Sequence, residues 1–320
     1  MKPLLTRLLQ NGPVITDGAW GTELQARGLA TGDFPDIWNL THPDRVAEVA
    51  RAYVEAGSQI ILTNTFGANR IRMADHAAPG QVAEINRRGA QISIQAAGNR
   101  ASVFASIGPT GRMLMAGDVS VDEVRAAFVE QAQALAQGEA HGLVIETMSD
   151  LEEAKAALDA AKGTGLPVVV CMVFDAGKEK DRTMTGATPE QVARELTDAG
   201  ADVIGANCGI GIEGYVPVCR RLREATHLPI WIKANAGLPT LVGGNVVYQT
   251  TPEQFASHVP ALIAAGASFI GGCCGSNPAF IRAVKRLTGA PATADALSAR
   301  PTRIRSEERR VGKECRARGA

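Results

Sequence analysis

Three cysteines of this chain occur in a pattern that suits a metal ion. Cys273 and Cys274 are adjacent and follow the apolar run 269–272, and Cys208 follows a similar run at 203–207. Neighbouring cysteines make an awkward disulfide, because the bridge requires a wider Cα separation. Three thiolates with one open position are typical of a catalytic zinc site. The alternative is that all three are small core residues, as free cysteines often are; the two similar settings favour the metal.

Other polar residues also stand where apolar runs end. These residues are Asp17, Asn64, Glu146, Asn207 and Asn235. Glu146 is the hardest of them to explain structurally, because a buried carboxylate without a partner is unfavourable. Asp17 precedes Gly18 and could simply cap a turn, and Asn64 and Asn235 could satisfy loop backbone. We interpret the set as candidates for substrate binding.

Zinc bound by three thiolates carries a net negative formal charge and is a weak Lewis acid toward water. It suits the capture of a substrate thiol, because the metal lowers the thiol pKa from about 8.5 and deprotonates the sulfur near neutral pH. The captured sulfur stays nucleophilic, so the cysteines predict alkyl transfer to sulfur. Asp17 and Glu146 would then bind the ammonium group of an amino-acid thiol, and backbone N–H groups near Gly18 would bind its carboxylate.

Alternating strand-like and helix-like segments predict how these residues meet. Strands are expected at 14–16, 59–64, 102–107, 142–146, 167–174, 202–207, 229–234 and 268–272. Helices are expected at 43–56, 81–99, 121–140, 151–161, 189–199, 215–225, 252–265 and 278–287. This alternation predicts an α/β fold, a (β/α)8 TIM barrel in which the carboxyl ends of the strands share one mouth. An open doubly wound sheet is the alternative, but no Gly-x-Gly-x-x-Gly follows a strand to support a dinucleotide fold.

Composition excludes several kinds of partner. Lys plus Arg and Asp plus Glu both number 33, so no net field favours nucleic acid or an anionic membrane. Six cysteines are too few for a disulfide framework and fit a reducing compartment. Arg7 interrupts the first apolar run, and no later run reaches membrane-spanning length. We therefore expect a cytoplasmic protein without a membrane or nucleic-acid partner.

The last part of the chain differs from the rest. After Leu287 the composition turns to Ala, Thr, Arg and Pro and then to a charged run without an apolar face. We expect a single domain over residues 1–290. Residues 291–320 are interpreted as a tail outside it, either a disordered C-terminus or read-through that is not native sequence.

Seven short motifs, in order along the chain, carry a resemblance to a known family. They are 17–23, 63–68, 106–111, 146–148, 207–209, 235–237 and 271–275. Together they resemble the zinc-dependent homocysteine S-methyltransferases, which include the homocysteine module of cobalamin-dependent methionine synthase and the betaine–homocysteine methyltransferases. The resemblance runs from about residue 10 to residue 288, and its paired-cysteine motif is highly specific.

The resemblance implies a homocysteine-binding barrel that transfers a methyl group to homocysteine and gives methionine. It implies that Cys208, Cys273 and Cys274 are the zinc ligands and the catalytic groups. It also implies that Asp17 and Glu146 contact homocysteine. Asn235 stands where an amide oxygen could fill the open position on the metal before substrate arrives. Gly18, Asn64 and Asn207 are the remaining candidates for substrate binding.

The methyl donor and two other functions stay open. One alternative is a subunit that activates homocysteine only for a separate methyl-corrinoid (cobalamin) protein, since the chain ends after one barrel. A small onium donor would need aromatic side chains at the site, for which Trp20, Phe34 and Trp38 are candidates, although ordinary packing explains them better. A remote alternative is a Schiff-base aldolase, for which Lys233 is the available strand lysine.

Overall fold

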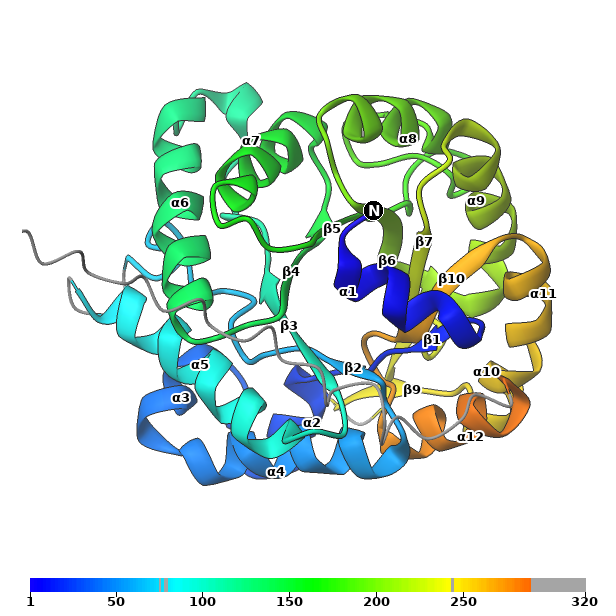
Figure 1. Ribbon diagram of the computed structural model, residues 1–320, viewed down its shortest axis with the longest axis horizontal. Coiled ribbons are helices and arrows are strands. Elements are labelled where there is room, and N and C mark those ends of the chain that lie inside the picture. The colour runs from blue at the N-terminus through cyan, green and yellow to red at the C-terminus, as the bar shows by residue number, and fades with distance from the viewer. Residues whose placement is uncertain (75, 78–79, 243–244, 289–320) are drawn as a thin grey trace, which may run out of the picture.

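Eight parallel strands form a ring in the computed structural model, which describes residues 1–74, 76–77, 80–242 and 245–288 (Figure 1). The strands are β1 (Val14–Ile15), β2 (Ile60–Ile61), β3 (Ser102–Ile107), β4 (Gly142–Met148), β5 (Val168–Met172), β6 (Val203–Gly211), β7 (Ile230–Asn235) and β10 (Ala267–Gly272). Their order is β1-β10-β7-β6-β5-β4-β3-β2. Gln59 joins the two ends of this order: its backbone N donates to Ile15 O at 2.7 Å, and Ile15 N donates to its Oε1 at 2.9 Å. The predicted (β/α)8 barrel is confirmed.

Helices surround the ring. They are α2 (Gly21–Gln25), α3 (Trp38–Thr41), α4 (Pro43–Ala56), α5 (Gln81–Ala97), α6 (Val121–Gln137), α7 (Leu151–Lys162), α8 (Pro189–Asp198), α9 (Ile212–Ala225), α10 (Pro252–Ser257), α11 (Val259–Ala264) and α12 (Pro278–Thr288). The first two of them, α2 and α3, were not predicted from the sequence. The prediction of a single helix over 252–265 is wrong, because the segment is divided into α10 and α11 at His258. Pro260 accounts for the break, because it has no N–H to donate and its ring crowds the preceding turn. The tail at 291–320 lies outside the described residues.

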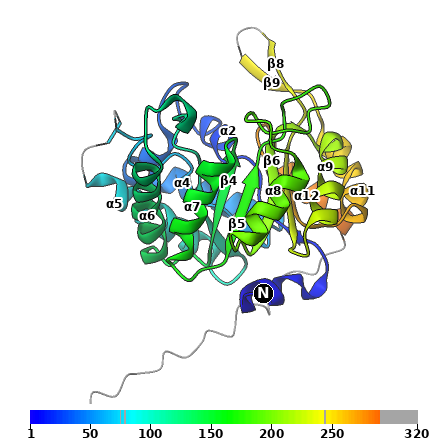
Figure 2. The same cartoon turned by 90° about the horizontal axis from the view of Figure 1, so that it is seen from above.

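Two features mark the two ends of the barrel. Helix α1 (Pro3–Leu8) lies across one end, and the antiparallel hairpin of β8 (Pro239–Val242) and β9 (Asn245–Tyr248) projects from the other (Figure 2). The sequence analysis missed this hairpin. It is inserted after β7, so it belongs to the end at which the strands finish.

The inside of the barrel has an apolar half and a polar half. At the α1 end, Trp231 stacks on Phe104 and Phe269, with ring centroids 6.2 and 5.1 Å apart, and all three are completely buried. These residues, with Val144 and Val203, belong to a cluster that also contains Leu5 and Leu8 of α1. Side chains alternate along a strand, so positions two or four residues further on point into the same interior. Those positions are Glu146, Asn207, Lys233 and Cys273. The fold therefore brings polar groups together at the end away from α1.

Asp36 connects the segment that follows β1 to the segment that follows β2. Its carboxyl group is buried, so its titration tests how these two segments pack. Its Oδ1 accepts a hydrogen bond from Gly67 N at 3.0 Å, and burial raises its pKa from 3.8 to about 7. Between about pH 4 and pH 7 the folded protein therefore holds a proton that the unfolded chain has lost, and the free energy of unfolding falls as the pH rises. Asp36→Asn retains the acceptor and removes the titration. The free energy of unfolding is measured by urea denaturation from pH 4 to pH 8. Over this range the difference in unfolding free energy between Asp36→Asn and the wild type is expected to shift by about 2–4 kcal/mol in favour of the variant. Identical pH dependence in the two proteins would contradict this assignment.

Candidate metal centre

The three cysteines singled out in the sequence come together at the polar end of the barrel. Their Sγ atoms all lie within 4.8 Å of one another, and they form the one group of His, Cys, Asp and Glu ligands found among the described residues. The Sγ atoms of Cys208 and Cys274 are 3.8 Å apart. Tetrahedral zinc with Zn–S bonds of about 2.3 Å requires sulfurs about 3.8 Å apart. The spacing of the cluster therefore fits a zinc ion bound by three thiolates.

The backbone at Cys208 has an unusual conformation. Cys208 has φ +62°, a left-handed value that a residue with a Cβ adopts at a cost of about 1–3 kcal/mol. The hydroxyl of Tyr215, on α9, lies 2.8 Å from Cys208 O and 3.0 Å from Asn207 O and so holds the end of β6. Thr147, the residue after Glu146, has φ +61°. Strained residues in the last parts of two strands, β4 and β6, are typical of a functional site.

The paired cysteines are fixed by backbone contacts. Cys273 N donates to Ala234 O at 2.6 Å, and Ala236 N donates to Cys274 O at 2.9 Å, so β7 and the residue that follows it hold both cysteines. Gly275 then turns the chain with φ +79°, and any Cβ there would collide with the ring of Tyr248. Tyr248 belongs to the hairpin, and its hydroxyl forms a hydrogen bond with Cys274. The hairpin that the sequence analysis missed thus contacts the sulfur cluster.

The sulfur cluster favours one thiolate among its three cysteines. Hydrogen bonds from Cys273 and Cys274 lower the pKa of Cys208, with further contributions from the backbone N–H of Gly209 and the amide of Asn235, whereas the same contacts with Cys208 raise the pKa of Cys273 and of Cys274. Asn235 is buried, and its Nδ2 lies 3.3 Å from Gly209 O, whereas its Oδ1 has no hydrogen-bond partner. An unpaired amide oxygen on a residue that contacts Cys208 suits a cation, since a buried acceptor without a partner is otherwise unfavourable. The donor set therefore fits a metal ion on two independent observations.

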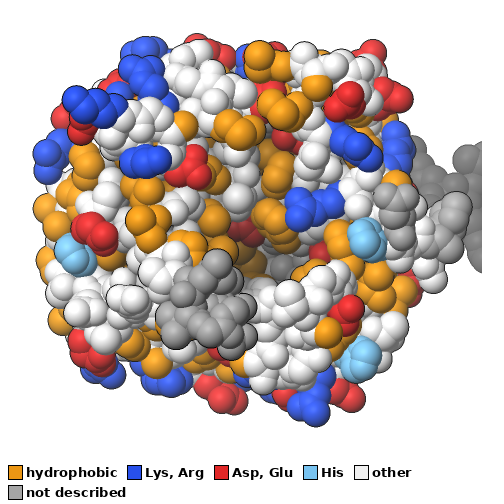
Figure 3. Space-filling view, turned by 180° about the vertical axis from the view of Figure 1, so that it is seen from behind, with side chains coloured by type: hydrophobic (Ala, Val, Ile, Leu, Met, Phe, Trp, Pro, Cys, Tyr) orange, Lys and Arg blue, Asp and Glu red, His pale blue; other side chains and the backbone are white. Residues whose placement is uncertain are grey.

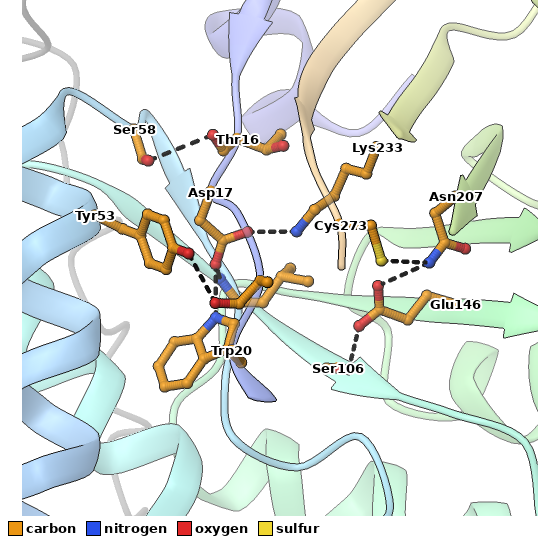
Figure 4. Close-up of polar contacts among 12 residues, drawn as sticks. Thr16, Asp17, Trp20, Tyr53, Ser58, Ser106, Glu146, Asn207, Lys233 and Cys273 are labelled. Atoms are coloured by element: carbon orange, nitrogen blue, oxygen red, sulfur yellow. Dashed lines mark hydrogen bonds and ion pairs between the residues drawn. The ribbon is translucent and has the colours of Figure 1, made fainter. Parts of the chain in front are cut away.

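Glu146 lies beside the cluster with one strong hydrogen bond and one weak one. Ser106 Oγ donates to its Oε1 at 2.5 Å, while Asn207 Nδ2 is 3.4 Å from its Oε2 (Figure 4). Burial raises the pKa of Glu146 to about 7, although the nearby ammonium group of Lys233 opposes the rise. A carboxylate in this state gains from a cationic partner.

Asn207 connects the two halves of the site. Its Oδ1 accepts from Thr147 N at 2.7 Å, and its Nδ2 lies 2.8 Å from Thr147 Oγ1 and 3.8 Å from Cys273 Sγ. It is completely buried. The amide of Asn207 is therefore used within the protein, where it sets the position of the segment that carries Glu146.

Asp17 is held by three partners. Its Oδ1 is 2.5 Å from Lys233 Nζ, and its Oδ2 accepts from Trp20 Nε1 at 2.8 Å and from Leu62 N at 2.7 Å (Figure 4). Burial alone would lower the pKa of Lys233, but Asp17, Glu146 and Cys273 together raise it. A Schiff-base lysine must lose its proton to attack a carbonyl. The ion pair opposes that loss, so the geometry does not support the aldolase alternative.

The remaining candidates lie at the edge of the site. Gly18 is packed so closely against the hydroxyls of Tyr53 and Ser276 that a Cβ would lie 2.7 and 2.8 Å from them. Asn64 donates to Pro35 O at 2.8 Å and to Asn39 Oδ1 at 3.1 Å, which ties the segments after β1 and β2 together.

The candidate aromatic residues for an onium donor are packed against neighbours. The ring of Phe34 stacks on His76 at 4.7 Å, and Trp38 is buried with its ring 4.6 Å from that of His42. Trp20 donates its indole N–H to Asp17. The contacts of Phe34 and Trp38 agree with the interpretation that ordinary packing explains them.

Sequence reasoning missed the contacts of several residues of the site and named Lys233 only as the lysine of the aldolase alternative. Ser106 and Lys233 stand two positions beyond Phe104 and Trp231, so strand alternation places them in the interior with Glu146. Tyr215 and Tyr248 carried no such signal, because a helix and an unpredicted hairpin supply them.

The end of the barrel that holds the site is hollowed at its centre (Figure 3). No helix in the described part of the chain combines the length and apolarity needed to cross a membrane.

Comparison with known proteins places this geometry in context. A family model described as homocysteine S-methyltransferase matches residues 14–288. The chain is 30% identical over 305 residues to the methionine synthase of Mycobacterium tuberculosis and 30% identical over 299 residues to that of Mycobacterium leprae. Each alignment covers 88% of this chain but only 25% and 24% of the respective relative. The chain thus spans about a quarter of the length of the curated relatives it matches.

A solved structure matches along its whole length. The metallated form of the homocysteine methyltransferase MmuM from Escherichia coli has a TM-score of 0.75 and 25% sequence identity to this chain. The match covers 89% of this chain and 100% of MmuM.

Proposed function

Because this chain belongs to the homocysteine S-methyltransferase family and is a methyltransferase, we propose that it transfers a methyl group to the thiol of homocysteine in a zinc-dependent reaction that gives methionine. Residues 1–290 are proposed as the homocysteine-binding domain. One observation carries the proposal: three cysteine sulfurs lie within 4.8 Å of one another beside a buried carboxylate.

Cys208, Cys273 and Cys274 are proposed to hold the zinc. A thiol substrate bound at such a zinc is deprotonated near neutral pH and remains nucleophilic. The protein around the cluster supports this use. The backbone N–H of Gly209, the amide of Asn235 and the hydroxyl of Tyr248 form hydrogen bonds with the sulfurs, and such contacts orient ligands and adjust their basicity.

Glu146 is proposed to hold the amino group of homocysteine. Its Oε2 has only the long contact to Asn207, and burial raises its pKa to about 7 although Lys233 lies nearby. An ammonium group would compensate the negative charge of the carboxylate and fix the amino-acid end while the thiol meets the cysteines. Asn207 and Ser106 are proposed to position Glu146 for this contact.

The methyl donor is either a small molecule or a separate methyl-corrinoid protein, and the corrinoid protein is the second candidate. The relatives in Mycobacterium are methionine synthases, and exposed apolar side chains occur in the loops at the same end of the barrel as the site. Met113, Met115, Met184 and Leu238 are 50%, 80%, 60% and 65% exposed. A macromolecular partner that covers the site would bury such side chains, whereas a small donor would leave them in water.

A donor panel tests the proposed reaction. Zinc-loaded protein is incubated with homocysteine and, separately, with S-methylmethionine, betaine and a methyl-corrinoid protein, and methionine is measured. We expect methionine with at least one donor and about 30-fold less after the metal is removed, because only about 3% of an unbound thiol with a pKa near 8.5 is ionised at pH 7. Full activity of the metal-free protein would contradict zinc dependence, and methionine with the corrinoid protein alone would favour the second candidate.

A further inference from the structure

The buried ion pair between Asp17 and Lys233 crosses an intervening strand. Strand β10 lies between β1 and β7, and its residue in register with Lys233 is Gly271. Because Gly271 has no side chain, the long side chain of Lys233 can reach over β10 to Asp17 (Figure 4). A Cβ at position 271 would collide with Thr16 Oγ1 and lie 2.6 Å from Asp17 O. The sequence of β10 thus makes room for this pair.

Both carboxylate oxygens of Asp17 already have hydrogen-bond partners. Its side chain is 0% exposed, and it accepts from an ammonium group, an indole N–H and a backbone N–H. A substrate ammonium group would have to displace Lys233, whose side chain is only 2% exposed. Removing one member of such a pair leaves an uncompensated buried charge, which is strongly unfavourable.

Glu146 differs from Asp17 in both respects. It is 8% exposed, and its Oε2 has only the 3.4 Å contact to the neutral amide of Asn207. The positive charge nearby, on Lys233, is held 2.5 Å from Asp17. Among Asp17, Lys233 and Glu146, one cation thus faces two carboxylates, and Glu146 is the one without an ion-pair partner.

We propose that Lys233 withdraws Asp17 from the substrate, so that Glu146 alone recognises the ammonium group and the site selects thiols that carry one amino group. This assignment rests on the proposed function and divides the work of the two carboxylates. Lys233 acts here as a positioning residue, and Glu146 determines specificity for the amine.

The test compares homocysteine with 4-mercaptobutyrate, which has the same thiol, chain length and carboxylate but no amine. Dissociation constants are measured by calorimetry on zinc-loaded wild type, Glu146→Gln, and the double variant Asp17→Asn/Lys233→Met. The double variant removes both charges together, because a single change would leave a buried charge unpaired. Zinc content and circular dichroism verify that each variant is folded.

The wild type is expected to prefer homocysteine. The double variant should keep this preference within about threefold, and Glu146→Gln should reduce it about 10–100-fold, as expected for losing a hydrogen bond to a charged group. The opposite pattern, with the preference lost in the double variant and kept in Glu146→Gln, would overturn the assignment and give the ammonium to Asp17. If no protein binds either thiol, the proposed function fails and the assignment fails with it.

Discussion

Cys273→Ser is expected to bind zinc at least about 100-fold more weakly than the wild type and to lose methyl transfer with it. The reason is that Cys273 supplies one of three sulfurs that lie within 4.8 Å of one another, and the remaining two cannot complete a site of three thiolates. The measurement is zinc per chain after dialysis, together with competition against a chromogenic chelator.

Cys219→Ala is the matched control for that experiment. Cys219 is completely buried on α9 with its Sγ near Leu262 O and Ala265 O, in the packing between α9 and α11. It should keep one zinc per chain and lose only the small free energy of a truncated core side chain. Full zinc binding by Cys273→Ser would contradict the metal centre.

Trp231→Ala is expected to lower the free energy of unfolding by about 3–5 kcal/mol, the range for removing a large buried aromatic side chain. Trp231 fills the apolar half of the barrel between Phe104 and Phe269 and is completely buried. Its indole Nε1 has no hydrogen-bond partner. Trp231→Phe should therefore cost less than about 1.5 kcal/mol, because it retains an aromatic ring and removes an unsatisfied donor.

Urea denaturation of the three proteins distinguishes packing from hydrogen bonding at this position. Equal losses in the Ala and Phe variants would mean that the indole N–H, rather than the ring, provides the stability. The position also bears on the site, because Lys233 follows two residues later on the same strand and points into the same interior.

The sequence was sufficient for the barrel and for the convergence of the cysteines. Strands buried on both faces appear as continuous apolar runs, so all eight could be located, although β1 and β2 have only two residues each. Once the barrel is assumed, Cys208 and Cys273 must approach each other, because both follow strand ends that share one mouth. This convergence depends on topology alone.

Contacts that depend on exact register could not be predicted. The pairing of Lys233 with Asp17 requires knowing that β10 separates their strands and that Gly271 stands opposite Lys233. The hairpin of β8 and β9 carried a signal, two short β-branched runs separated by Gly-Gly, that was not used. Tyr248 reaches Cys274 only because of that hairpin, so its role could not be foreseen from spacing.

The proposal that the three cysteines hold one zinc ion to which homocysteine adds its thiol is tested most directly by X-ray absorption at the zinc edge. The account predicts three sulfur neighbours at about 2.3 Å in the zinc-loaded protein and four after homocysteine is added. An unchanged sulfur count on adding homocysteine, or fewer than three sulfurs without it, would contradict the account.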